Sequence, residues 1–198
     1  MIELATFLTD FADAGVMIPL CAAVAVTLLM LGRARLALSW TAVSLAVWGT
    51  VLLLKVAGYL MAEVAPVVRE QTGLVTASGH AAGAAVAYGA LAGLLMGSGT
   101  TMVRRSCLAA VGIAIIIGIT RVFLGEHTPA EAILGGVVGI AGAGAFAAFA
   151  REALQGSGRA ALFAAAAVTL LVVHGDHVNL ERFIASASAR AVQSLRAE

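Results

Sequence analysis

Charged residues are scarce in this chain. Asp, Glu, Lys and Arg make up only 12% of its 198 residues, whereas 61% are apolar. Soluble domains have about a quarter charged residues, so this chain has too few to cover a globule that faces water. Disorder is excluded because it requires low hydrophobicity and high net charge, and the net charge is +1. Twelve Lys and Arg against eleven Asp and Glu leave no basic surplus for nucleic-acid binding.

Cysteine is equally rare. Cys21 and Cys107 both lie in apolar runs, where a buried thiol behaves as a small hydrophobe. They form neither a disulfide framework nor a metal-binding motif. We also expect no cleavable signal peptide, since the chain begins with Glu3, Asp10 and Asp13 and has no basic segment before them.

The chain consists largely of long apolar runs. A membrane-spanning helix needs roughly 20 mostly apolar residues. The abundant Gly and Ala favour close packing of such helices. The sequence therefore predicts an all-α, polytopic membrane protein in which six transmembrane helices form one bundle and residues 1–198 form a single domain. The predicted spans are Ala14–Leu31, Leu36–Ala62, His80–Met96, Ser106–Leu124, Ala130–Ala150 and Ala160–Val173.

Arginine residues predict the orientation of this bundle. Six of them lie in or beside the loops that follow the first, third and fifth spans, and Glu152 is the single acid there. By the positive-inside rule these loops are cytoplasmic. We therefore expect both termini outside a bacterial-type inner (plasma) membrane. The six are Arg33, Arg35, Arg104, Arg105, Arg151 and Arg159.

The last segment, residues 178–198, has apolar residues at helical spacing with Arg182 and Arg190 between them. This pattern predicts an amphipathic helix on the membrane surface. The alternative is a cytoplasmic tail that follows only five true spans.

Ionisable residues in or beside membrane spans are costly, so each is a functional hypothesis. Five of them fall at the predicted outer ends of the spans: Lys55, His80, Arg121, His127 and Glu131. The Arg guanidinium suits phosphate oxygens because its planar fork donates two hydrogen bonds at once. A helix that begins near His127 places Glu131 on the same face, where its carboxylate can fix the imidazole tautomer.

A small polar turn precedes the third span. Residues 76–80 read Thr-Ala-Ser-Gly-His and run into a predicted helix N-terminus, where unpaired backbone N–H groups attract phosphate. Ser78-Gly79-His80 and Arg121-x5-His127-x3-Glu131 resemble two motifs of the type 2 phosphatidic acid phosphatase superfamily, Pro-Ser-Gly-His and Ser-Arg-x5-His-x3-Asp. The resemblance covers about residues 55–139, which we take as the active-site core.

The sequence departs from the family pattern at several positions. Ala77 stands where the family has Pro, Thr120 where it has Ser, and Glu131 where it has Asp. The family's first motif, Lys-x6-Arg-Pro, is represented by Lys55 without the Arg-Pro pair. Arg69 is a candidate replacement for the absent Arg.

The resemblance implies a metal-independent lipid phosphatase without a cofactor. It makes His127 the nucleophile, with Glu131 as its partner, and His80 the acid and base. It assigns phosphate binding to Lys55, Ser78, Gly79 and Arg121. The implied substrates are membrane lipids such as a polyprenyl diphosphate, phosphatidate, phosphatidylglycerol phosphate or a lipid A phosphate.

Structural alternatives exist for these residues. Glu131 fits a capping box with Thr128, and Ser78 fits an N-cap. Lys55 and Arg121 can extend along a helix toward water. At the end of the sixth span, His174, Asp176 and His177 form a polar cluster that we interpret as a span end rather than a metal site.

Other functions remain open at this stage. A covalent intermediate also permits phosphate transfer to a lipid or sugar acceptor. The absent Arg-Pro pair is compatible with an inactive, lipid-binding family member. A transporter also carries buried charges, although it usually distributes them through the membrane depth. The sequence does not set the oligomeric state.

Overall fold

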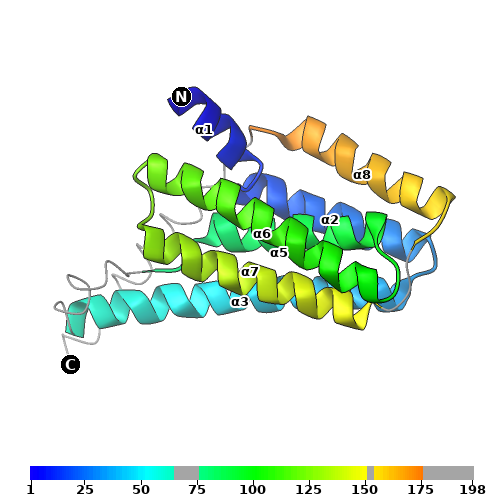
Figure 1. The fold of residues 1–198 in the computed structure, drawn as a ribbon, viewed down its shortest axis with the longest axis horizontal. Helices are drawn as coiled ribbons and strands as arrows, with labels where there is room; N and C mark the ends of the chain where they lie inside the picture. The colour runs from blue at the N-terminus through cyan, green and yellow to red at the C-terminus, as the bar shows by residue number, and fades with distance from the viewer. Residues whose placement is uncertain (65–75, 151–153, 176–198) are drawn as a thin grey trace.

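The computed structural model describes residues 1–64, 76–150 and 154–175. These residues form helices and no strand, which confirms the predicted all-α class. The helices are α1 (Ile2–Asp10), α2 (Ala14–Met30), α3 (Ala34–Val64), α5 (Gly79–Met96), α6 (Thr100–Phe123), α7 (Pro129–Phe149) and α8 (Ser157–Val173). Figure 1 shows α2, α3, α5, α6 and α7 running along the long direction of the molecule.

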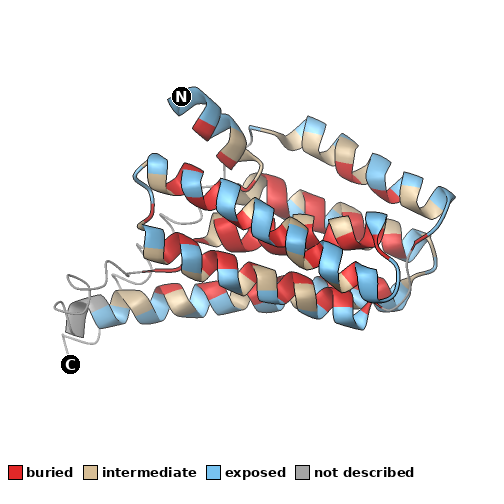
Figure 2. Ribbon diagram, in the orientation of Figure 1, coloured by how far each residue is buried: buried red, intermediate tan, exposed pale blue. Residues whose placement is uncertain are grey.

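Helix α5 is the centre of the bundle. It packs against α6, α7, α3 and α2, and most of its residues are buried (Figure 2). Its sequence, GHAAGAAVAYGALAGLLM, is nearly all small residues. Small side chains let backbones approach closely, so a helix of this composition suits a position surrounded by other helices.

Close backbone approach is most marked between α5 and α7. A Cβ on Gly135 of α7 would overlap the carbonyl of Ser78, and one on Gly139 would lie 2.5 Å from the carbonyl oxygen of Ala82. On the other side of α5, a Cβ on Gly89 would lie 2.6 Å from that of Ala110 in α6. Glycine therefore sets how near α7 comes to the start of α5, where the candidate site lies.

The outer surface of the bundle is apolar. Five segments are long and apolar enough to cross a membrane: Ile2–Met30, Ala34–Met61, Gly79–Met96, Thr100–Phe123 and Pro129–Phe149. Helix α8 is apolar but shorter, with 17 residues. Large apolar side chains such as Leu53, Ile119 and Ile133 are exposed. A water-soluble protein would bury such side chains, so the surface fits a multi-pass membrane protein.

Several predicted helix starts were wrong because each prediction places the arginine outside the helix. Helix α6 begins at Thr100 rather than Ser106, so Arg104 and Arg105 lie in the helix and not in a loop. Arg35 and Arg159 likewise lie in the first turns of α3 and α8. Arginine is a good helix former, and its long side chain can reach the membrane interface from a helix end. A charge therefore does not mark where a membrane helix stops.

Some predictions fall outside the described residues. The amphipathic tail at 178–198, Asp176, His177 and Arg69 are among them, and the single-domain division stays a prediction.

Candidate active site

The start of α7 holds a histidine–carboxylate pair. Thr128 is the N-cap, Pro129 follows it, and the Thr128 hydroxyl accepts a hydrogen bond from the Glu131 backbone N–H. The Glu131 carboxylate contacts His127 Nδ1 at 3.1 Å through Oε2. Because an ionised carboxylate only accepts hydrogen bonds, it places the imidazole proton on Nδ1. His127 precedes the helix rather than lying in it, yet the capped turn still brings the two side chains together.

Glu131 also holds the loop before α5. Its Oε1 accepts a hydrogen bond from the Thr76 backbone N–H at 2.8 Å, and its backbone carbonyl accepts one from Ser78 N–H at 3.0 Å. The glutamate is 6% exposed, so these bonds are made away from water. One residue thus joins the Ser-Gly-His segment to the turn that carries His127.

Arg121 lies beside His127 at the end of α6. Its backbone carbonyl accepts hydrogen bonds from the N–H groups of Glu126 and His127, at 3.0 and 3.3 Å. The turn passes through Gly125, whose φ of 73° is readily adopted only by glycine. Arg121 is 7% exposed, and its Nη2 lies 3.6 Å from Glu126 Oε2. A buried arginine on this turn has the charge and the paired donors that suit an anion such as phosphate.

The first turn of α5 meets a lysine from α3. Ser78 is the N-cap: it is fully buried, and its Oγ accepts a hydrogen bond from Ala81 N–H at 3.4 Å. Lys55 is 4% exposed, and a Cβ on Gly79 would lie 3.9 Å from Lys55 Cε. A helix N-terminus carries partial positive charge. The lysine and the helix end together form a second cationic surface.

His80 lies on the other side of this turn, next to α2. Its Nε2 is 3.6 Å from Asp13 Oδ2, and both side chains are slightly exposed. Asp13 is the N-cap of α2, where its Oδ1 accepts a hydrogen bond from Gly15 N–H at 2.8 Å. The sequence analysis did not select Asp13 as a site residue.

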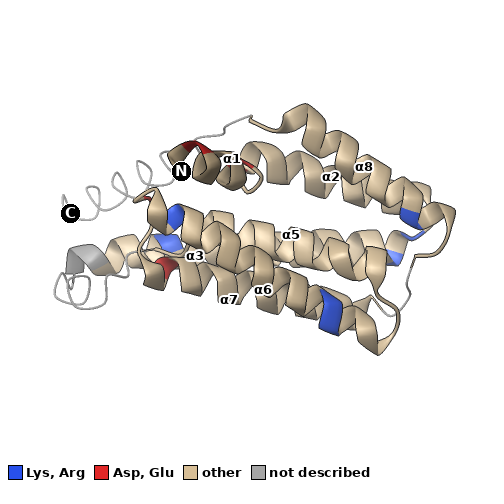
Figure 3. Cartoon of the chain, turned by 45° about the horizontal axis from the view of Figure 1, so that its top comes forward, with Lys and Arg blue, Asp and Glu red and all other residues tan. Residues whose placement is uncertain are grey.

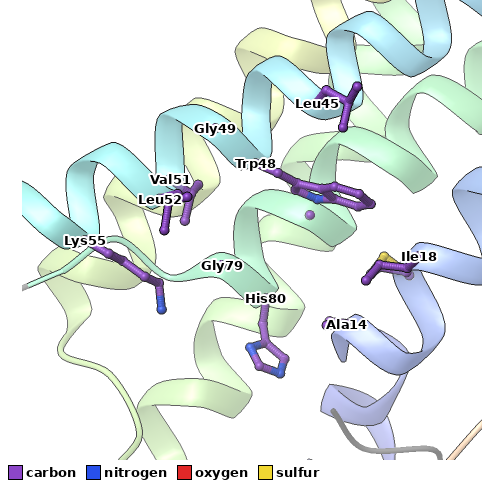
Figure 4. Close-up of a pocket in the computed structure, with 13 residues that line it drawn as sticks. Ala14, Ile18, Leu45, Trp48, Gly49, Val51, Leu52, Lys55, Gly79 and His80 are labelled. Atoms are coloured by element: carbon purple, nitrogen blue, oxygen red, sulfur yellow. The ribbon is translucent and has the colours of Figure 1, made fainter. Parts of the chain in front are cut away.

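A cavity of about 380 Å³ opens beside His80 and Lys55 (Figure 4). Figure 4 shows these two side chains toward one end, with the Trp48 indole toward the other. Most of the remaining lining is apolar. Ile18, Leu45 and Leu52 line it and are between 45% and 59% exposed. The cavity therefore reaches the lateral, apolar surface of the bundle between α2 and α3.

In the described part of the chain, no group of three or more His, Cys, Asp or Glu side chains is arranged to hold a metal ion. His174, at the end of α8, packs its ring against Phe7 and Phe11 of the N-terminal segment, with centroids 4.8 and 4.2 Å apart.

All seven site residues predicted from the sequence lie at the same end of the bundle. Hydrogen bonds link Glu131 with His127 and with Ser78, and Arg121 with His127. Lys55 lies against Gly79, and His80 faces Asp13 instead. Sequence reasoning missed Asp13, Thr76 and Trp48. An Asp one residue before an apolar run does predict an N-cap, but no sequence signal pairs it with His80.

Comparison with known proteins gave one match. Residues 61–155 match the family model described as the PAP2 superfamily. This range contains the Ser-Gly-His segment, Arg121, His127 and Glu131, whereas Lys55 and Asp13 lie before it. No curated protein and no solved structure matches the chain.

Proposed function

This chain belongs to the PAP2 superfamily, whose members are generally phosphatases, and from that premise we propose that it hydrolyses a lipid phosphate or diphosphate through a phosphohistidine on His127. The observation that carries the proposal is the 3.1 Å contact between His127 Nδ1 and Glu131 Oε2, made by a histidine whose backbone N–H bonds the carbonyl of the buried Arg121. A histidine oriented by a carboxylate, on the turn that follows a buried arginine, has the parts of a nucleophile for phosphoryl transfer.

The first step forms the covalent intermediate. With its proton on Nδ1 held by Glu131, His127 attacks phosphorus through Nε2. The bond between phosphorus and the leaving oxygen breaks, and His80 donates a proton to that oxygen. Lys55, Arg121 and the first turn of α5, with the Ser78 hydroxyl and the Gly79 N–H, bind the other phosphate oxygens. Stabilisation of this charge is the largest contribution expected in phosphoryl transfer.

The second step releases phosphate. His80, now neutral, takes a proton from a water molecule, and the resulting hydroxide attacks phosphorus. The phosphorus–nitrogen bond breaks and inorganic phosphate leaves, so both histidines return to their starting forms. Lys55 and Arg121 supply the countercharge, so the proposed route uses no metal.

The cavity position supports this assignment of roles. In-line displacement requires the nucleophile and the leaving group on opposite sides of phosphorus. His80 lines the apolar cavity, whereas His127 is not among its lining residues. A lipid whose leaving oxygen meets His80 would therefore place its apolar tail in the cavity, and in-line attack then requires His127 on the other side of phosphorus.

The lateral opening supports a membrane lipid as substrate. An apolar tail can enter between α2 and α3 directly from the bilayer, because the exposed side chains at the opening are apolar. Polyprenyl diphosphates, phosphatidate and lipid A phosphates all have this combination of tail and head. The arginines at the other end of the bundle favour an active site that faces outward from an inner membrane.

The proposal is tested by measuring phosphate release from these three lipid classes, using detergent-purified protein with EDTA present. We expect EDTA-resistant release that His127→Ala abolishes. The matched control is His174→Ala, which removes a histidine that stacks on Phe7 and Phe11, and we expect it to keep wild-type activity.

Three outcomes would contradict the proposal. Release that persists in His127→Ala would mean that another group is the nucleophile. No release from any substrate by folded protein would indicate an inactive lipid-binding member or a transporter. Product that forms only when a lipid or sugar acceptor is added would indicate a phosphotransferase.

A further inference from the structure

The proposed acid and base, His80, lies where two helices meet. It is the second residue of α5, and its ring faces the end of the α1–α2 corner, residues 11–13. Among the described residues, the charged side chains that face this ring or line its cavity are Asp13, the N-cap of α2, and Lys55 of α3. Of these two, Asp13 is the one whose charge complements a protonated imidazole.

The two oxygens of Asp13 have separate contacts. Oδ1 caps α2 by accepting the Gly15 N–H, at 2.8 Å. Oδ2 lies 3.6 Å from His80 Nε2, a distance at which catalytic pairs are often found before substrate binds and tightens them. The cap therefore uses Oδ1, and Oδ2 is the oxygen that faces the His80 ring.

The corner that carries Asp13 is tied to the helix that carries His80. The Tyr88 hydroxyl of α5 donates a hydrogen bond to the Phe11 carbonyl at 2.8 Å. Ala12 and Val16, on either side of Asp13, are 3% and 0% exposed. The hydrogen bond and the buried neighbours fix the corner against α5. They therefore hold the Asp13 carboxylate opposite the His80 ring.

We propose that Asp13 is a positioning residue for His80, and this rests on the proposed phosphatase function. The carboxylate holds one ring nitrogen, and the ring presents its other nitrogen to the leaving oxygen, where the proton is transferred. The site would then contain two carboxylate–histidine pairs, Glu131 with the nucleophile and Asp13 with the acid. Asp13 comes from a helix outside residues 61–155, the part that matches the family.

The test compares two small substrates of similar size with different leaving groups. Benzyl phosphate releases an alcohol, which needs a proton as it leaves; p-nitrophenyl phosphate releases a stable phenolate, which does not. We compare kcat/KM because it covers the step in which the leaving group departs. Asp13→Asn is the first variant, since Asn is also a favoured N-cap. Asp10→Asn, a nearby carboxylate in α1, is the matched control.

We expect Asp13→Asn to lower kcat/KM for benzyl phosphate by about 10- to 100-fold, as for other carboxylates that orient functional histidines. The kcat/KM of Asp13→Asn for p-nitrophenyl phosphate should change little. Asp13→Glu should recover part of the kcat/KM lost on benzyl phosphate, and Asp10→Asn should behave as wild type on both substrates. In a His80→Ala background, Asp13→Asn should cause no further loss, because both changes remove the same function. If Asp13→Asn does not fold, Asp13→Ser keeps a cap without reaching the ring.

Two results overturn the proposal while leaving the phosphatase function intact. One is wild-type kcat/KM in Asp13→Asn when His80→Ala loses activity selectively on benzyl phosphate. The other is an equal loss on both substrates, which would show a structural role only. If His80→Ala itself hydrolyses benzyl phosphate normally, His80 is not the acid, and the proposed function and this inference both fail at that step.

Discussion

At the scale of single residues, Glu131 has a structural and a chemical role at once. The sequence presents these as alternatives, a helix cap or a catalytic carboxylate. In the structure Oε2 accepts the Thr128 N–H at 3.0 Å and contacts His127 Nδ1 at 3.1 Å, while Oε1 accepts the Thr76 N–H. The cap fixes the side chain in the rotamer that orients the histidine, so the stability of the helix end and the proposed nucleophile depend on the same atoms.

Substitution of Glu131 can separate the two roles. Glu131→Gln keeps the length and an acceptor that suits a capping box, but it loses the negative charge that balances the positive charge developing on the His127 ring as it bonds phosphorus. We expect kcat to fall by roughly 10²- to 10⁴-fold, the range for carboxylates that orient a catalytic histidine. The free energy of unfolding, measured by thermal unfolding in detergent, should fall by no more than about 2 kcal/mol, the upper value for loss of a cap. Glu131→Asp keeps the charge and should retain more activity than Glu131→Gln; the reverse order would contradict this role.

At the scale of elements, the distance between α5 and α7 determines whether the site assembles. Gly135 lies against the Ser78 backbone, so α7 packs directly on the N-cap of α5, the helix that carries His80. The hydrogen bond from Ser78 N–H to the Glu131 carbonyl needs this separation. Packing between α5 and α7 and the geometry of the candidate site are therefore coupled through one glycine.

Gly135→Ala tests this coupling. The new Cβ would overlap the Ser78 carbonyl, which is backbone and cannot rotate away. We therefore expect overpacking to lower the free energy of unfolding by about 1–3 kcal/mol. We also expect a lower kcat. The matched control is Gly112→Ala in α6, where a Cβ meets nothing within 4 Å and alanine is the better helix former. Gly112→Ala should be at least as stable as wild type. Equal stability of the two variants would contradict the packing argument.

The elements also show how far the sequence could predict this molecule. Apolar runs identified α2, α3, α5, α6, α7 and α8, because length and hydropathy determine a membrane helix. The first helix, α1, was not predicted, since Glu3 and Asp10 interrupt its short apolar pattern. Motif spacing led to His127 and Glu131 because their contact is local. The pairing of Asp13 with His80 could not be predicted, since it depends on how α1, α2 and α5 pack.

At the scale of the whole molecule, charge is distributed unequally along the bundle. For the described residues, Figure 3 shows Lys, Arg, Asp and Glu toward the two ends, with a long uncharged middle. Arg33, Arg35, Arg104, Arg105 and Arg159 lie near the starts of α3, α6 and α8. The site residues lie at the opposite end, near the end of α6 and the starts of α5 and α7. Positive charge away from the site is the arrangement expected when the site faces outward.

Helix α6 allows this orientation to be measured within one segment. It has 24 residues, so it is about 36 Å long at 1.5 Å per residue, enough to cross a hydrocarbon core of about 30 Å. Ser98 is exposed just before the helix and Glu126 is exposed just after it. In a chain with Cys21→Ala and Cys107→Ala, we expect a membrane-impermeant maleimide to label Glu126→Cys in intact cells. Ser98→Cys should react only after the membrane is permeabilised. The opposite pattern would place the site in the cytoplasm, and labelling of both in intact cells would show that α6 does not span the membrane.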